Sequence, residues 1–439
     1  MKYAQALDYI YGASRFGIKL GLNNISKLLE LLGNPHEELK IIHVAGTNGK
    51  GSTSSFITSI LKNAGYNVGL FTSPHLEVFT ERIRINGHNI DEEDLARITA
   101  IIKEKAEYMV QNGYNHPTQF EIITAIAFYY YKEKNVDFVV LEVGMGGRYD
   151  STNVVKDPLL CVITPVSLDH KDELGDTIEK IAYHKAGIIK KGSDVVVYPQ
   201  EAVTHEIIYK EADEKNACVY IADIDNREVI ESSIEGQKFN FKLDNEIYEN
   251  VEISLLGDHQ INNAIVATTA INVLRKKHNI NISKENIYKG LKETKWAGRI
   301  EILTKNPTLI IDGAHNEDGA NSLARAMDKY FKNKDVTFVL GMLKDKDADG
   351  VIEILMPRTK KIITTKPNSD RSLTAQELKE KINKIGRDSI AIDDISKAIE
   401  YAVDTSKEDE VVIFAGSLYM IGEVRSIIRN KYKNKKLPL

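Results

Sequence analysis

The chain has 439 residues, a formal net charge of −5 and 42% apolar residues, which is the composition of an ordinary globular protein of two or three domains. Lysine and arginine are spread along the chain, which argues against a nucleic-acid-binding surface. Cys161 and Cys218 form no CxxC pattern, so neither a disulfide framework nor a zinc site is predicted. The N-terminus resembles no signal peptide, and no run reaches the about 18 apolar residues of a membrane span. We therefore expect a cytoplasmic monomer with no membrane or nucleic-acid partner.

The first half of the chain alternates short β-branched runs with longer helical segments. The runs are apolar along their whole length, as expected of parallel strands that are buried on both faces. Alternation of this kind predicts a parallel sheet with right-handed crossovers. The expected strands are 41–45, 67–72, 137–144, 159–165 and 194–199, and the expected helices include 56–64, 91–111 and 120–132.

The pattern changes around residues 228–256, where polar and apolar residues alternate about an Asp244-Asn245 turn. This predicts a small antiparallel excursion at a sheet edge. Helices are then expected at 258–277 and 283–292, and strands at 308–312, 336–341, 361–365, 389–393 and 410–416. We predict an α/β protein with an ATP-binding, P-loop-type, mostly parallel sheet domain at 1–295 and a Rossmann-like α/β domain at 296–439.

The most informative stretch is IIHVAGTNGKGSTSSFI, residues 41–57. A strand that enters a glycine loop and then a helix can aim backbone N–H groups at phosphate, and Lys50 and the helix N-terminus add positive charge. The usual phosphate loop, G-x-x-x-x-G-K-[ST], has no glycine between its lysine and hydroxyl residue, whereas Gly51 stands there in this chain. A tight turn with a solvated lysine is the alternative. The loop residues are Gly46, Thr47, Asn48, Gly49, Lys50, Gly51 and Ser52.

Further motifs follow this loop in a specific order, and together they cover nearly the whole chain. They are TSPHL (72–76), ERIRING (81–87), LEVGMGGRYDSTN (141–153), LDH (168–170), KAGI (185–188), GDHQINNA (257–264), WAGR (296–299), DGAHN (312–316) and GSLYMIGEVR (416–425). The series resembles that of folylpolyglutamate synthases, which belong with the Mur ligases. A glycine at position 51 is a trait of that family. Ala297, where a proline is expected, and His184, where an acidic residue is usual, depart from the pattern.

The resemblance implies an ATP-dependent ligase that joins L-glutamate to the γ-carboxylate of a reduced folate. A carboxylate is a poor electrophile, and phosphorylation by ATP would convert it into an acyl phosphate with a good leaving group. The enzyme must then neutralise phosphate charge and hold two anionic substrates together. Some family members also add the first glutamate to dihydropteroate, and these motifs do not separate the two activities.

The resemblance also assigns residues to ATP and magnesium. Ser73, Glu142 and His170 match metal ligands, and the resemblance implies two Mg²⁺ ions. A helix-capping or core histidine is the alternative for His170. Lys185 matches a lysine that is carbamylated in the family, and a solvated lysine is its alternative. The positions that match ATP contacts from the second half of the site are Asn263, Arg299 and Asp312.

Two further groups of residues are expected next to the substrates. His315 would meet the phosphoryl group or the incoming glutamate, although the Asp and Asn residues of its turn are also ordinary turn formers. Phe120 could stack on a pterin ring, whereas a helix-start contact is equally consistent with HPTQFE. The substrate-site candidates are Thr118, Phe120, Glu121 and Ser417.

Two other functions are weighed against the folate ligase. A cell-wall Mur ligase would carry a loop without the inserted glycine and usually a separate N-terminal UDP-binding domain, but this loop begins about 45 residues into the chain. A GTPase-type switch would carry an N-K-x-D motif after a strand, and NKDV at 333–336 lacks that spacing. Both are less consistent with the sequence.

Overall fold

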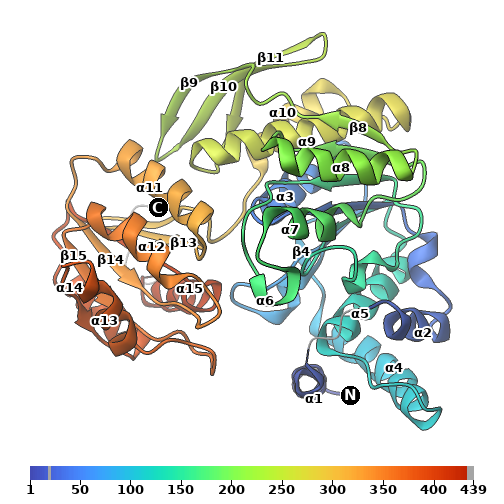
Figure 1. The fold of residues 1–439 in the computed structure, drawn as a ribbon, viewed down its shortest axis with the longest axis horizontal. Coiled ribbons are helices and arrows are strands. Elements are labelled where there is room, and N and C mark those ends of the chain that lie inside the picture. The colour runs from blue at the N-terminus through green and yellow to red at the C-terminus, as the bar shows by residue number, and fades with distance from the viewer. Residues whose placement is uncertain (18–20, 433–439) are drawn as a thin grey trace.

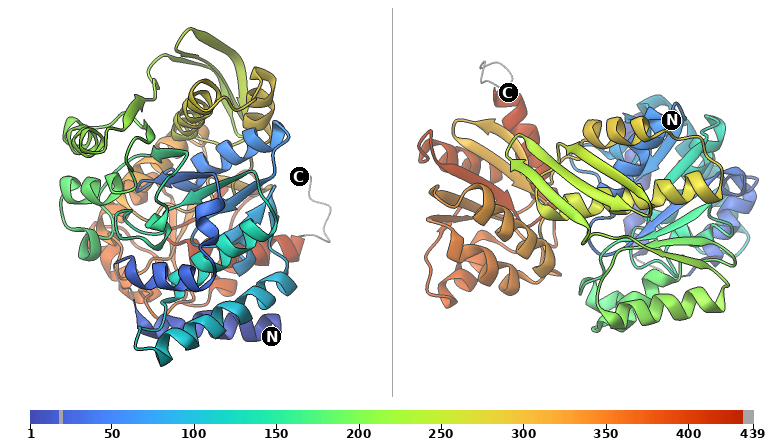
Figure 2. Two further views of the ribbon diagram at one scale, coloured as in Figure 1. Left: turned by 90° about the vertical axis from the view of Figure 1, so that its right-hand side faces the viewer. Right: turned by 90° about the horizontal axis from the view of Figure 1, so that it is seen from above.

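The computed structural model describes residues 1–17 and 21–432. They form a large N-terminal α/β body, a smaller C-terminal α/β body and a three-stranded sheet that lies beside both (Figures 1 and 2). No helix within these residues is long and apolar enough to cross a membrane.

An eight-stranded sheet forms the centre of the N-terminal body, in the order β4-β3-β2-β5-β1-β6-β7-β8. Strands β2, β5, β1, β6, β7 and β8 are parallel to one another. Strands β3 and β4 add an antiparallel hairpin at one edge. Because β1 lies between β5 and β6, the loops that follow these strands meet at one edge of the sheet. The strands are β1 (Ile41–Ala45), β2 (Val68–Phe71), β3 (Ile83–Ile85), β4 (His88–Asn89), β5 (Phe138–Glu142), β6 (Leu160–Ile163), β7 (Asp194–Val197) and β8 (Cys218–Ile221).

Helices cover both faces of this sheet, which explains why its central strands are almost entirely apolar. On one face Ile42 and Val44 pack with α3 (Lys50–Asn63), α9 (Asp258–Lys277) and α10 (Lys284–Glu293). On the other face Ile41 and Ala45 belong to apolar clusters with the remaining large helices. Those helices are α1 (Tyr3–Gly12), α2 (Asn23–Leu31), α4 (Glu92–Gln111), α5 (Gln119–Glu133), α7 (Ile178–Ala186) and α8 (Ala202–Glu214), and the single turn α6 (Lys171–Leu174) precedes α7.

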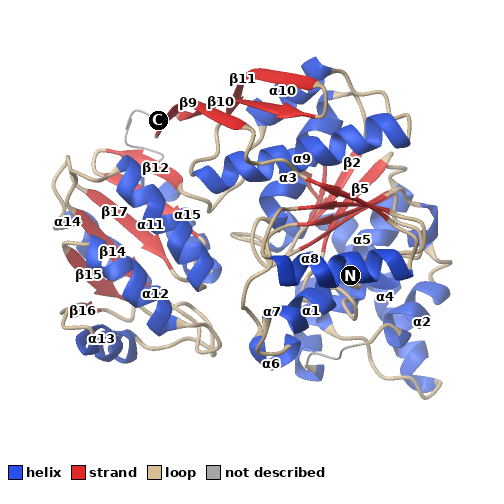
Figure 3. Cartoon of the chain, turned by 45° about the horizontal axis from the view of Figure 1, so that its top comes forward, coloured by secondary structure: helices blue, strands red, loops and turns tan. Residues whose placement is uncertain are grey.

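The antiparallel segment is a separate sheet of β9 (Arg227–Ser233), β10 (Gly236–Leu243) and β11 (Glu246–Ile253), with Asp244 and Asn245 at the predicted turn. The sequence predicts an excursion at a sheet edge, whereas these strands pair only with one another and do not extend the large sheet. The reason is packing: Phe239, Phe241 and Leu243 project from one face of β10 onto the core that contains α9, and this face needs a helix beneath it. Figure 3 shows this sheet above α9 and α10.

The C-terminal body has a six-stranded sheet in the order β12-β13-β17-β14-β15-β16, parallel except for β12. Helices α11, α12 and α13 cover one face of it, and α14 and α15 cover the other. The strands are β12 (Glu301–Lys305), β13 (Thr308–Asp312), β14 (Val336–Leu340), β15 (Lys361–Thr364), β16 (Ile390–Ala391) and β17 (Val411–Ala415). The helices are α11 (Glu317–Tyr330), α12 (Ala348–Leu355), α13 (Ala375–Lys384), α14 (Ile395–Asp404) and α15 (Leu418–Tyr432).

The predicted fold class is confirmed, with a mostly parallel N-terminal sheet and a separate C-terminal α/β sheet. Strands β3, β4, β8 and β12 were not predicted, because they are short and lie at or next to the edges of their sheets. The sheet strands after residue 300 all belong to the C-terminal sheet, but the division between residues 295 and 296 stays a prediction.

Candidate active site

The glycine loop leaves β1 at Gly46 and enters α3 at Lys50. Gly46 and Gly49 have φ angles of 153° and 80°, which residues other than glycine rarely adopt. The loop is braced from below, because the Thr47 amide donates to the Pro165 carbonyl at 2.7 Å. The amides of residues 50–52 belong to the first turn of α3, whose N–H groups have no partner inside the helix. The loop therefore offers these donors to an anion.

Two lysines from different helices meet at this loop. Lys50 Nζ donates to the carbonyls of Gly46 at 3.0 Å and Thr47 at 3.1 Å, and Lys185 Nζ donates to the same Gly46 carbonyl at 2.8 Å. Lys185 is buried. Burial lowers the pKa of Lys185 well below its usual value, and the charge of Lys50 adds to this effect. Burial also lowers the pKa of Lys50. Two amines held on one carbonyl make this a site where an anion would be stabilised.

Glu142 lies at the end of β5, next to β1, where the resemblance places a metal ligand. Its buried carboxylate accepts the Ser73 amide at 3.3 Å. Burial raises the pKa of Glu142, and the nearby charge of Lys50 opposes that rise. His170 follows β6, and burial together with the charge of Lys346 lowers its pKa to about 4. His170 is therefore a neutral ring at neutral pH, the form that can bind a metal.

The chemistry of these side chains suits Mg²⁺. Within residues 1–17 and 21–432, no group of at least three His, Cys, Asp or Glu side chains could hold a metal ion. An ion bound by Glu142 and His170 would therefore depend on the Ser73 hydroxyl, water or phosphate for its other ligands. Mg²⁺ is the common ion that keeps such oxygen ligands, so Glu142 and Ser73 fit it, whereas the nitrogen of His170 is an unusual ligand for it.

A second strand–loop–helix unit faces the glycine loop from the C-terminal body, where β13 leads into α11. The buried carboxylate of Asp312 accepts the Ile300 amide at 2.9 Å and the Ala314 amide at 2.8 Å. Burial raises the pKa of Asp312, whereas the charge of Arg299 lowers it. The Arg299 guanidinium packs against Gly313 and donates to the Gly298 carbonyl at 2.9 Å. In this loop the Asp312 carboxylate therefore stabilises the backbone by accepting hydrogen bonds from two amides.

Asn263 and His315 also lie at the cleft. Asn263, on α9, donates to Gln260 at 3.1 Å, and its amide lies against Gly49, where a Cβ atom would be 2.7 Å from the Asn263 oxygen. His315 Nδ1 donates to the Gly313 carbonyl at 2.8 Å, which leaves Nε2 facing the N-terminal body, 3.7 Å from Asp169. The structure thus brings the predicted ATP residues of both bodies to one cleft.

Several polar contacts cross this cleft. Lys346 Nζ pairs with Asp169 at 2.7 Å, and both side chains are nearly buried. Burial opposes ionisation of Asp169, but the nearby His315 ring and the charge of Lys346 outweigh it and lower the pKa of the carboxyl. Asn48 donates to Asp318 at 2.7 Å on the other side of the loop. Asp169 and Lys346 were absent from the predicted set, although both follow the ends of parallel strands.

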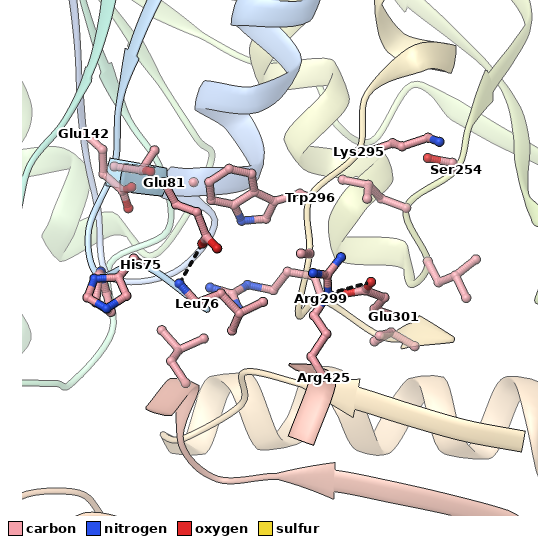
Figure 4. Close-up of a pocket in the computed structure, with 18 of the residues that line it drawn as sticks. His75, Leu76, Glu81, Glu142, Ser254, Lys295, Trp296, Arg299, Glu301 and Arg425 are labelled. Atoms are coloured by element: carbon pink, nitrogen blue, oxygen red, sulfur yellow. Dashed lines mark hydrogen bonds and ion pairs between the residues drawn. The ribbon is translucent and has the colours of Figure 1, made fainter. Parts of the chain in front are cut away.

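Two cavities open from the cleft, and both are lined by Ser73 and Leu418. The larger, of about 650 Å³, is lined by Phe120, His170, His315, Lys346 and Ser417 among others. The hydroxyl of Ser417 is buried there without a hydrogen-bond partner in the described part of the chain. The smaller, of about 510 Å³, is lined by Glu142, Trp296 and Arg299 (Figure 4).

The segment before α5 combines both interpretations left open by the sequence. Thr118 and Glu121 form a capping box, with the Thr118 amide donating to Glu121 at 2.7 Å and the Glu121 amide donating to the Thr118 hydroxyl at 3.3 Å. Glu121 is buried in this role, whereas Thr118 and Phe120 line the larger cavity. The Phe120 ring packs directly against Gly144.

Comparison with known proteins finds one family model that matches within the N-terminal body and another that matches within the C-terminal body. The Mur ligase middle domain matches residues 44–271, and the glutamate ligase domain of Mur ligases matches residues 298–418. The chain is 38% identical to the dihydrofolate synthase/folylpolyglutamate synthase of Bacillus subtilis, over 97% of this chain and 99% of that protein. This chain belongs to the folylpolyglutamate synthase and dihydrofolate synthase family. Like its curated relatives, this family member is an ATP-dependent ligase.

Solved structures of related enzymes have a similar fold over nearly the whole length of this chain. The folylpolyglutamate synthase of Thermotoga maritima has a TM-score of 0.85 and 35% identity, covering 100% of this chain and 99% of that one. An Escherichia coli relative, solved in complex with DHPP and ADP, has a TM-score of 0.87 and 30% identity over 98% of each chain. Because the full-length relatives are folate enzymes, the Mur-type cell-wall alternative is less supported.

Proposed function

We propose that this protein adds L-glutamate to the γ-carboxylate of reduced folates, using ATP to form an acyl phosphate, and that it also converts dihydropteroate to dihydrofolate. The convergence of the glycine loop, Glu142 and the C-terminal Arg299 on one cleft is the observation that carries the proposal. Acyl-phosphate chemistry needs a triphosphate, a carboxylate and an amine at one point, and a cleft between two bodies can bring them together.

The glycine loop would hold the ATP phosphates. A phosphate at the first turn of α3 would attract Lys50 away from the Gly46 and Thr47 carbonyls, since an oxyanion is a stronger acceptor than a carbonyl. Ser52 would lie at the start of the same helix, and Arg299 would approach from the opposite side of the cleft with a rigid guanidinium suited to phosphate. Asn263 and Asp312 would support the nucleotide from α9 and β13.

Mg²⁺ held by Ser73, Glu142 and His170 would neutralise charge on the transferring phosphoryl group. The protein's own part in that site is to keep the ligands in the form that binds. Glu142 is buried beside Lys50, and the neutral ring of His170 is kept near Asp169, whose pairing with Lys346 fixes that segment. We propose these three residues as the ligands.

Lys185 would act as its carbamate. The neutral amine attacks CO₂, an N–C bond forms as one C–O π bond opens, and one proton leaves the nitrogen, so the neutral amine becomes an anionic carbamate. Burial favours the neutral amine that starts this reaction, because it lowers the pKa of Lys185. The carbamate would supply oxygen ligands near the phosphate loop, in the narrow space that Lys185 shares with Lys50 and His170.

The larger cavity would hold the folate and the incoming glutamate. Phe120 and the neighbouring Thr118 lie on its N-terminal side, where an aromatic ring could contact a flat pterin. Ser417, Lys346 and His315 lie on its C-terminal side, and they would receive the carboxylates of glutamate near the acyl phosphate. Glu121 would act indirectly, because its carboxylate holds the start of α5.

An assay of ATP hydrolysis with a panel of acceptors tests this proposal. The protein is incubated with ATP, Mg²⁺ and glutamate together with tetrahydrofolate, dihydropteroate or a UDP-sugar peptide, or with guanine nucleotide in place of ATP. We expect glutamate-dependent ADP release with tetrahydrofolate and also with dihydropteroate. Activity with the UDP-sugar peptide alone would contradict the folate assignment, and activity with tetrahydrofolate alone would remove the second reaction.

A further inference from the structure

The inserted glycine of the phosphate loop faces an aromatic ring. An ideal Cβ atom placed on Gly51 would be 2.6 Å from Cζ2, 2.9 Å from Cε2 and 3.0 Å from Nε1 of Trp296. Real Cβ atoms do not approach other heavy atoms so closely, so the ring occupies the space that a side chain at position 51 would need. Figure 4 shows the ring at the cavity between Glu142 and Arg299.

The glycine is not required by the backbone at this position. Gly46 and Gly49 need their positive φ angles, but Gly51 lies within α3 and has no such angle. In a helix, glycine is less favourable than alanine. The local conformation therefore favours alanine at position 51, and the contact with Trp296 is the feature that excludes it.

Trp296 is itself held from several directions. The Arg84 guanidinium lies over its ring, 5.3 Å from the ring centroid, and the ring packs against the core cluster that contains α3. The preceding residue, Lys295, is tied to the same helix, because the Ser55 hydroxyl donates to the Lys295 carbonyl at 3.2 Å. The ring and its neighbour thus fasten the chain to the helix that carries the loop.

The next residues belong to the C-terminal body instead. The Gly298 carbonyl accepts the Gly313 amide at 2.9 Å, and the Gly298 amide donates to Glu301 at 2.8 Å. Arg299, which follows directly, packs on Gly313. Only Ala297 separates the residue fastened to the phosphate loop from those fastened to the opposite side of the cleft. A movement of Trp296 would therefore shift Arg299 relative to the loop.

We propose that Trp296 is a positioning residue for nucleotide binding, whose ring replaces a side chain at position 51 and couples the phosphate loop to Arg299. This inference rests on the proposed role of the loop in binding ATP. It assigns a purpose to the glycine that distinguishes this loop from the usual phosphate loop: the glycine makes room for the ring that links the two halves of the site.

The chain contains a single tryptophan, so its tryptophan fluorescence comes from this ring alone. ADP binding to the wild-type protein is first measured by calorimetry, which tests the proposed function independently of the tryptophan. We then expect ADP to change the emission of Trp296. If calorimetry detects no ADP binding, the proposed function fails; if ADP binds without any change in emission, the coupling through Trp296 is overturned.

A double-mutant cycle measures the coupling between the two residues. Gly51→Ala should weaken ADP binding about tenfold in the wild-type background but by less than about twofold in the Trp296→Leu background, because residues in contact are strongly coupled. KM for ATP should follow the same pattern, while KM for glutamate should change little. A general loss of stability would not separate the two substrates in this way.

Gly12→Ala is the matched control. Gly12 ends α1 with helical φ and ψ angles of −60° and −24°, and a Cβ atom there would meet no atom within 4 Å. We expect ADP binding to be unchanged in this variant. If Gly51→Ala fails to fold, recovery of folding in Gly51→Ala/Trp296→Leu supports the proposal. An equal effect of Gly51→Ala in both backgrounds, on folding or on ADP binding, overturns it.

Discussion

Two strand–loop–helix units face each other across the cleft, and their charged side chains make different kinds of contact. Between β1 and α3, Lys50 and Lys185 rest on the Gly46 carbonyl, and burial lowers the pKa of both amines. Between β13 and α11, both carboxylate oxygens of Asp312 accept backbone amides. The first unit holds its amines on carbonyl contacts that a phosphate can replace. The second uses its charged group to fix the loop.

The difference shows that a motif at the end of a strand does not by itself define a chemical role. Removal of a side chain from the first loop should reduce turnover and leave the fold intact. Removal of one from the second loop should reduce stability at least as much as turnover. The variants below test this distinction, beginning with the largest effect expected.

Lys50→Ala should reduce turnover roughly a thousandfold, because it removes a positive charge from a buried site where phosphate charge develops. Circular dichroism and thermal unfolding should be close to those of the wild type. Lys62→Ala, an exposed lysine near the end of the same helix, is the control and should be silent. A folded Lys50→Ala protein with undiminished ligase activity would remove the phosphate loop from the mechanism.

Lys185→Ala should reduce turnover roughly a hundredfold, which is the range found when a group that supports a metal site is lost. Acetate should restore part of the activity, because its carboxylate can occupy the space of the carbamate. Lys180→Ala, on the exposed side of α7, should neither lose activity nor respond to acetate. Full activity of Lys185→Ala in CO₂-depleted buffer would show that the carbamate has no role.

Asp312→Ala should lower the free energy of unfolding by about 2 kcal/mol or more, because two buried amides lose their acceptor. Asp312→Asn keeps one carbonyl oxygen and should lose about half as much. Urea unfolding of both variants measures these values. An unchanged stability with a large rise in KM for ATP would reverse the comparison between the two loops.

The strand beneath the first loop should make the protein sensitive to acid. His43 on β1 is fully buried against the Thr152 hydroxyl at 2.9 Å, and burial, aided by the charge of Lys190, lowers its pKa from 6.5 to about 3. The unfolded chain therefore binds a proton first as the pH falls below 6.5, and stability decreases until about pH 3.

His43→Gln removes this titration and retains a hydrogen-bonding side chain. Between about pH 6 and pH 4, the wild type should lose ~2 kcal/mol more stability than the variant. Denaturant unfolding at each pH provides the measurement. Parallel stability curves for the two proteins would show that His43 does not contribute to acid sensitivity.

Much of the fold was predictable because central parallel strands are apolar along their length. Strands such as β1, β5 and β13 were placed within a residue or two of their observed bounds. The edge strand β8 could not be predicted, because its residues are partly exposed and carry no clear pattern. The separate antiparallel sheet was read as an edge extension because local alternation shows a half-buried strand but not what covers it.

The site shows the same limit. The glycine loop, Glu142 and Asp312 lie at the ends of predicted strands. Their place at the cleft was therefore predictable, since the ends of parallel strands meet at one edge of a sheet. Asp169 and Lys346 come from different bodies, so their pairing depends on how the two bodies are placed relative to each other. Motif spacing within the sequence does not predict that placement. The contact of Trp296 with Gly51 is equally remote in sequence, although the unusual glycine was visible from the start.

Transfer of ¹⁸O from the substrate carboxylate tests the central claim most directly. Tetrahydrofolate labelled in its γ-carboxylate is incubated with the protein, ATP, Mg²⁺ and glutamate, and the released phosphate is analysed by mass spectrometry. In the proposed reaction the carboxylate oxygen bonds to the γ-phosphorus, and attack by the glutamate amine then breaks its bond to carbon. One labelled oxygen should therefore appear in inorganic phosphate for each amide formed, and label found in AMP or in water instead would contradict the acyl-phosphate account.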